Sequence, residues 1–101
     1  MAKYVFPAIF TKEIEGGYSI YFPDVEGCYT QGEDIQDSLD MANDALCLML
    51  YDFEEKHKTI PKPSNPLDLK PGDNSFVSLI NCDTTEYRRF YENKIPLGVS
   101  N

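Results

Sequence analysis

Hydrophobic and polar residues alternate in three segments near the start of the chain. A run of aromatic and β-branched residues at about 3–12 is typical of a strand. Gly16 and Gly17 then turn the chain back into a second strand at about 17–22. A third short strand is predicted at 28–31. Together the three segments predict an antiparallel meander.

A helical period replaces this alternation at residue 34. The apolar positions recur at intervals of three and four residues, which indicates one amphipathic helix from about Asp34 to Lys56. Asp34 can cap the first turn with its side-chain oxygen, and Asp37 is favoured near the positive end of the helix dipole. The apolar positions are Ile35, Leu39, Ala42, Leu46, Met49, Leu50 and Phe53. Such a helix buries its apolar face on the sheet.

The second half of the chain is predicted as a connection, a strand and a short helix. Four of the seven prolines fall within 59–73, which indicates a connection that contains no packed element. A strand is expected at 75–81, with its residues 76–80 paired to the first strand. Either Asp83 or Thr84 would cap a helix at 85–92. The predicted fold class is therefore α+β, in the order β-β-β-α-β-α.

Pro7 limits where the first strand can lie. Proline has no N–H group and cannot donate a hydrogen bond to a neighbouring strand. We therefore expect this strand at an edge of the sheet, or with position 7 facing away from its neighbour.

Composition and charge narrow the classes of function. A chain of 101 residues forms one domain, and its net charge of -8 disfavours direct nucleic-acid binding and favours a basic partner. Many soluble domains are simply acidic, and this alternative stays open. The three cysteines are widely spaced and there is one histidine, so no structural zinc site or other cofactor is expected. We expect buried free thiols and a reducing, cytoplasmic setting.

Catalytic chemistry is weakly represented. His57 lies between two lysines at the predicted helix end, where a solvated residue is expected in place of a catalytic base. Asp40, Asp44 and Asp83 would be the ligands if the chain were a remnant metal-dependent nuclease, but the first strand carries no carboxylate. We predict that the chain is not an enzyme.

Two features point to a binding surface. Strand alternation places Tyr21 opposite to the face of Ile20, so Tyr21 and Tyr29 are either exposed aromatics or packed beneath the helix or the connection. Two acidic loops flank the third strand, and we expect both at one end of the sheet. The candidate partner-binding residues are Asp24, Glu26, Tyr29, Glu33 and Asp34.

Three stretches of the sequence resemble the amino-terminal domain of HicB-type antitoxins. They read Y-V-F-P-A-I-F at 4–10, G-G-Y-S-I-Y-F-P-D-V-E-G-C-Y-T-Q-G at 16–32, and S-L-D-M-A-N-D-A-L at 38–46. The resemblance implies a partial RNase H-like fold and an antitoxin that binds and occludes a small, basic, RNA-cleaving HicA-type toxin. It divides the chain into a toxin-neutralising domain at 1–94 and a loose tail at 95–101.

Relatives in this family usually add a carboxy-terminal module that binds operator DNA. Only seven residues follow Lys94, too few for such a module, so we do not expect this chain to bind DNA. A homo-oligomer, a dimer or tetramer, is expected because edge strands of a small sheet can pair between subunits. A stand-alone oligomeric scaffold is accordingly the alternative function, ahead of the nuclease. No apolar run approaches the length of a membrane span.

Overall fold

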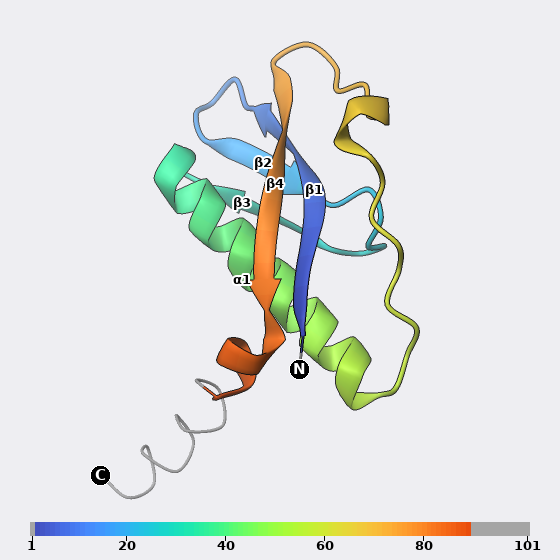
Figure 1. The fold of residues 1–101 in the computed structure, drawn as a ribbon. Helices are drawn as coiled ribbons and strands as arrows, with labels where there is room; N and C mark the ends of the chain where they lie inside the picture. The colour runs from blue at the N-terminus through green and yellow to red at the C-terminus, as the bar shows by residue number, and fades with distance from the viewer. Residues whose placement is uncertain (1, 90–101) are drawn as a thin grey trace, which may run out of the picture.

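The computed structural model describes residues 2–89, in which one long helix lies across a four-stranded antiparallel sheet (Figure 1). The strand order is β3-β2-β1-β4. The elements are β1 (Lys3–Lys12), β2 (Tyr18–Tyr21), β3 (Tyr29–Gly32), α1 (Ile35–Glu55), η1 (Pro66–Asp68) and β4 (Ser75–Asp83). Residues 84–89 are helical after β4. The α+β class and the order of the elements are confirmed.

β1 lies inside the sheet, between β2 and β4, so the expectation of an edge position is wrong. The other expectation for Pro7 is confirmed. The N–H of Lys12 donates to Asn74 on the β4 side, over 2.8 Å, so odd-numbered residues direct their nitrogen toward β2. Pairing between β1 and β2 begins only at Ile9. The nitrogen of Pro7 therefore points past the end of β2, and no ladder hydrogen bond is lost.

The start of α1 is held by two side-chain caps. Asp34 is the N-cap residue, and its carboxylate accepts a hydrogen bond from the Asp37 N–H over 2.8 Å. Asp37 in turn accepts from the Glu33 N–H over 2.9 Å. The first bond satisfies an N–H group that the first turn leaves without a helical partner, and the second ties the residue before the cap to the helix. The predicted helix, its bounds and its cap are confirmed.

The close packing of α1 on β3 requires glycine at position 32. A Cβ atom built on Gly32 would lie 2.5 Å from the Cα of Ser38, which is backbone and cannot move aside. Ser38 is fully buried there. The glycine thus brings the first turn of α1 directly against the last residue of β3.

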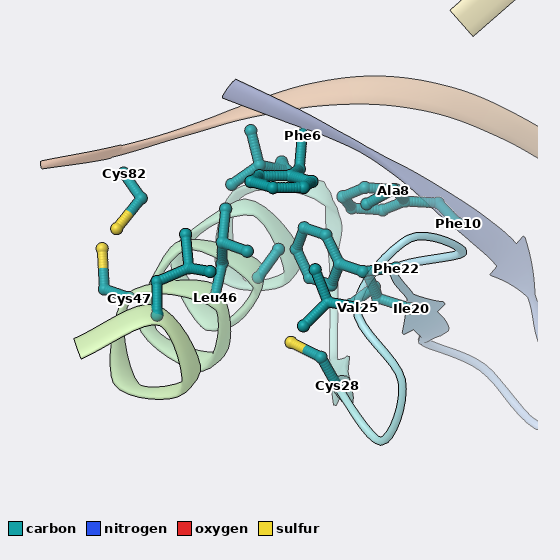
Figure 2. Close-up of a cluster of buried hydrophobic side chains, with 13 residues drawn as sticks. Phe6, Ala8, Phe10, Ile20, Phe22, Val25, Cys28, Leu46, Cys47 and Cys82 are labelled. Carbon is teal, nitrogen blue, oxygen red and sulfur yellow. The ribbon is translucent and has the colours of Figure 1, made fainter. Parts of the chain in front are cut away.

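The core fills the space between α1 and the sheet (Figure 2). Alternate residues of β1 point toward the helix, which contributes most of its predicted apolar face. Ile35 and Leu39 are exposed near the start of α1, so the prediction that they pack on the sheet is wrong. The three cysteines, Cys28, Cys47 and Cys82, are buried free thiols, as expected. The other members of the cluster are Phe6, Ala8, Phe10, Ile20, Phe22, Val25, Ala42, Leu46, Leu50 and Ile80.

The proline-rich connection is tied to the rest of the fold. Ile60 packs against the core, η1 contacts β4, and Ser64 is hydrogen-bonded to Asp24. Within η1, the side chain of Asn65 caps the Leu67 N–H over 2.9 Å. The connection therefore includes one short helical turn that the proline pattern did not predict.

β4 pairs with β1 along its whole length, which confirms the predicted partner of 76–80. Asp83 then caps the following helix, because its carboxylate accepts from the N–H groups of Thr85 and Glu86 over 3.0 and 3.3 Å. The predicted end of that helix at residue 92 and the predicted tail at 95–101 lie outside the described residues.

Candidate partner-binding surface

The two acidic loops lie at opposite ends of β3. Tyr21 pairs with Tyr29 at one end of the strand, and Tyr18 pairs with Gly32 at the other. Asp24 and Glu26 precede the first end, whereas Glu33 and Asp34 follow the second. The expectation that both loops share one end of the sheet is wrong, because the whole length of β3 separates them.

Two of the five predicted residues are engaged in structural hydrogen bonds. The carboxylate of Asp24 accepts from the N–H of Ser64 over 2.8 Å and from its hydroxyl over 2.5 Å. Asp24 is half-buried by this contact. Asp34 caps α1, as described above. Glu26, Tyr29 and Glu33 are exposed, and their side chains form no hydrogen bond with other residues in the range 2–89, so these side chains can contact a partner.

Tyr21 and Tyr29 are exposed aromatics on β2 and β3. They pair across β2 and β3, and their side chains are 48% and 73% exposed. Ile20, which alternates with Tyr21, is buried under α1. Of the two alternatives left open by the sequence, exposure is confirmed and burial beneath the helix is wrong.

An apolar groove opens between the start of β3 and α1. Its volume is about 440 Å³, and Tyr29 stands at one side while Leu48, 52% exposed, stands at the other. Asp52 adds one carboxylate to its rim. The remaining lining residues are Gly27, Cys28, Ala45 and Met49. We call this the Tyr29 groove.

A second groove, of about 760 Å³, lies at the other end of β3 and is acidic. Four carboxylates line it, from the β1–β2 turn and the start of α1: Glu13, Glu15, Glu33 and Asp37. Glu13 accepts a hydrogen bond from the hydroxyl of Ser19. We call this the acidic groove. Of its four acids, only Glu33 is among the predicted contact residues.

The charges of the chain are segregated. Residues 13–55 contain twelve of the seventeen Asp and Glu residues and none of the nine Lys and Arg residues. This segment forms β2, β3 and α1 and supplies the whole lining of both grooves. The run without cations was visible in the sequence and would have identified Glu13 and Glu15. It makes this side of the molecule attractive to a basic partner.

The carboxylate of Glu54, near the end of α1, has a structural role. Tyr4 and Thr84 donate to the same carboxylate oxygen of Glu54, each over 2.8 Å, and Arg88 donates to the other over 3.2 Å. Burial opposes ionisation, but these bonds outweigh it and lower the pKa of Glu54 below its usual value. Burial and the bond to Glu54 raise the pKa of Tyr4 to about 12. The cluster joins β1, α1 and the helix after β4.

Neither a metal centre nor a membrane span is found among residues 2–89. In this range no group of three or more His, Cys, Asp or Glu side chains is arranged to hold a metal ion. Asp40, Asp44 and Asp83 are therefore not brought together as the nuclease alternative requires. No helix in the same range is long and apolar enough to cross a bilayer.

Comparison with known proteins decides the family. The family model described as "HicB_like antitoxin of bacterial toxin-antitoxin system" matches residues 6–93. The chain belongs to the HicB-like antitoxin family. The match includes both grooves and the whole of β3, so the candidate surface lies within the family domain.

Two HicB antitoxins are similar over part of their length. Antitoxin HicB of Escherichia coli is 40% identical over 60 residues, which cover 58% of this chain and 43% of that protein. Antitoxin HicB 1 of Photorhabdus laumondii is 41% identical over 49 residues, which cover 48% of this chain and 32% of that protein. The matched stretch spans less than half of each of these relatives.

Solved structures agree on the fold. A chain of a toxin–antitoxin complex from Streptococcus pneumoniae superposes with a TM-score of 0.77 at 28% identity, covering 84% of this chain and 72% of that one. The amino-terminal domain of the Burkholderia pseudomallei antitoxin HicB superposes with a TM-score of 0.64 at 22% identity, covering 76% of this chain and 95% of that domain. At that identity the second likeness concerns the HicB fold alone.

Proposed function

We propose that this chain neutralises a small, basic, RNA-cleaving toxin of the HicA type by binding it and covering its RNA-binding site, without catalysis of its own. The observation that carries the proposal is the cation-free segment 13–55, which holds an apolar and an acidic groove at the two ends of one exposed strand. A protein that binds RNA presents cations to phosphate. The same cations would be attracted to the carboxylates of this surface.

The two grooves suit different parts of such a partner. The Tyr29 groove offers apolar contact area and an exposed aromatic ring, the side-chain type that dominates binding energy at protein interfaces. The acidic groove offers four carboxylates to Lys or Arg side chains. Exposed charge pairs mainly accelerate and orient association, so we assign affinity to the Tyr29 groove and steering to the acidic groove. Asp24 and Asp34 then support the surface through the loops that they hold.

The proposal is tested with a purified, small, basic toxin of the HicA type. We expect the two proteins to co-purify, and we expect RNA cleavage by the partner to stop when one equivalent of this chain is added. Tyr29→Ala should weaken binding by about 10- to 100-fold, the range for an interface anchor. Asp73→Lys, an exposed acid outside the segment 13–55, is the control and should bind normally. Cleavage that continues at saturating concentrations of this chain would refute occlusion.

Self-association through β4 is a second property that we propose. β4 is a nine-residue strand at the edge of the sheet, paired with β1 on one side only, and it carries no Lys, Arg or Pro. Such an edge can pair with a second copy through the outward N–H and C=O groups in its middle, while the C=O of Asn81 accepts from the Asn43 side chain and the N–H of Ser75 donates to Gly72. Leu79, 52% exposed on this strand, is the site of the test. Light scattering should report a dimer or tetramer that Leu79→Lys dissociates; an unchanged mass would exclude this edge.

A further inference from the structure

Two thiols face each other where α1 packs on β4. Cys47 comes from the helix and Cys82 from the strand, and the residues are 3% and 2% exposed. Figure 2 shows their sulfur atoms directed at one another, and the two side chains are hydrogen-bonded. Cys28 lies apart from this pair, beside Val25. The fold thus brings together two of the three cysteines and leaves the third as an internal control.

The hydrogen bonds give the two sulfurs different roles. The sulfur of Cys47 accepts from the Cys82 thiol and from the backbone N–H of Asp83. The first bond is the main cause that lowers the pKa of Cys47, against the opposing effects of burial and of the nearby carboxylates of Asp44 and Asp83. The bond and burial raise the pKa of Cys82. The direction of this bond favours the thiolate of Cys47 over that of Cys82, so we take Cys47 as the attacking sulfur.

Small molecules have a route to the pair. Both cysteines line an open pocket of about 710 Å³ between α1, β4 and the helix that follows it. Lys3 contributes a cation to the lining, while Asp44, Asp83 and Glu86 contribute carboxylates. An uncharged oxidant is not repelled by this acidic rim. By contrast, burial raises the pKa of Cys28 to about 11, so Cys28 remains a thiol at neutral pH.

We propose that Cys47 and Cys82 form an oxidation site for hydrogen peroxide, and that its product is a disulfide between α1 and β4. The Cys47 thiolate attacks one peroxide oxygen, the O–O bond breaks, and a Cys47 sulfenic acid and hydroxide form. The Cys82 thiol then attacks the sulfenic sulfur, forms the S–S bond and releases water. The two thiols lose two electrons, and the peroxide is reduced to water and hydroxide.

The disulfide would restrict the unfolded chain. It joins residues separated by 34 others, including the whole connection at 59–73. Closing a loop of this length removes conformational freedom from the unfolded state and stabilises the fold. For a domain of this size the midpoint of thermal unfolding should rise by about 10 °C or more. Oxidation would then reversibly stabilise the family domain, whether or not a toxin is bound.

The test is oxidation of the purified, reduced chain with hydrogen peroxide, followed by intact mass, peptide mapping and thermal unfolding. We expect a monomer lighter by two hydrogens, a linked Cys47–Cys82 peptide pair, and a higher unfolding midpoint that falls back after reduction. The Cys28→Ser variant should behave in the same way. The Cys82→Ser variant should stop at a Cys47 sulfenic acid that dimedone captures.

Three results would overturn the proposal. One is a native chain that gains oxygen without losing two hydrogens. Another is a disulfide that involves Cys28 or joins two chains. The third is a Cys47–Cys82 bond that leaves the unfolding midpoint unchanged or lowers it, because the native packing would then not accommodate the clip. Dimedone labelling of Cys82→Ser reports on Cys47 even where Cys47→Ser fails to fold.

Discussion

Asp24→Ala separates a structural role of this residue from a role in partner binding. The half-buried carboxylate accepts two hydrogen bonds from Ser64, over 2.8 and 2.5 Å, and these hold the connection against the β2–β3 loop. A hydrogen bond to a charged group contributes about 1.5–3 kcal/mol when buried, and less when water can reach it. For this partly solvated pair of bonds we expect a loss of about 2 kcal/mol in the free energy of unfolding.

Urea and thermal unfolding, followed by circular dichroism, measure this loss. A decrease of about 2 kcal/mol lowers the unfolding midpoint by about 8–16 °C in a domain of this size. Glu26→Ala is the matched control, because Glu26 is an exposed acid in the same loop, and its change should stay within about 0.5 kcal/mol. Ser64→Ala keeps the backbone bond and should lose about half as much as Asp24→Ala.

A double-mutant cycle on Asp24 and Ser64 checks the physical reason. Because both side chains share one contact, the losses of the single variants should not add in the double variant. If Asp24→Ala unfolds like the wild type, or if the losses are additive, the anchoring role is refuted. Asp24 would then again be a candidate for direct contact with the partner.

Further predictions concern the packing and capping of α1 and the Glu54 cluster. Gly32→Ala should destabilise the fold by about 2–4 kcal/mol in urea unfolding, since its Cβ would lie 2.5 Å from the Cα of Ser38; a near-neutral effect would refute the close contact. Asp34→Ala should cost about 1 kcal/mol by the same assay, and Asp34→Asn, which keeps the cap, should cost less. The pKa of Glu54 is lower in the folded than in the unfolded chain, so ionised Glu54 stabilises the fold at pH values above the ordinary pKa range of a carboxyl group. This stabilisation is lost as the pH falls through the folded-state pKa. Glu54→Gln should therefore lose less stability than the wild type between neutral pH and about pH 3, and equal acid sensitivity would contradict the assignment.

Local sequence signals were sufficient where a residue acts on its own neighbours. Asp34 lies at the boundary between strand residues and a helical period, so its capping role follows from the residues beside it. The helix after β4 was less determined, because the sequence allowed either Asp83 or Thr84 as its cap and the structure shows Asp83 in that role. The exposure of Tyr21 was one of two alternatives, because strand alternation assigns faces without saying which face the helix covers.

Contacts between distant segments were not predictable in the same way. Pro7 suggested an edge strand, but β2 is too short to reach it, so β1 can lie inside the sheet. The pairing of Asp24 with Ser64 joins residues 40 positions apart, and no local pattern indicates it. The Cys47–Cys82 contact depends in the same way on the angle at which α1 crosses β4.

The charge of the surface could have been read more fully from the sequence. The predicted contacts at positions 24, 26, 33 and 34 depend on single acidic residues in two loops. The absence of any Lys or Arg between Lys12 and Lys56 is a property of the whole segment, and the fold places that segment around both grooves. A run of one sign over two strands and a helix is a stronger indication of a basic partner than any one carboxylate.

The measurement that tests the central claim most directly is the affinity of this chain for a purified, small, basic HicA-type toxin, by calorimetry at low and high salt. We predict stoichiometric binding that weakens as salt rises, because the cation-free surface of residues 13–55 attracts the partner. Charge reversal at Glu26 and Glu33 together should weaken binding and reduce its dependence on salt, whereas Asp73→Lys should do neither. The account would be contradicted if no binding occurred at low salt. It would also be contradicted if the affinity changed neither with salt nor with charge reversal at Glu26 and Glu33.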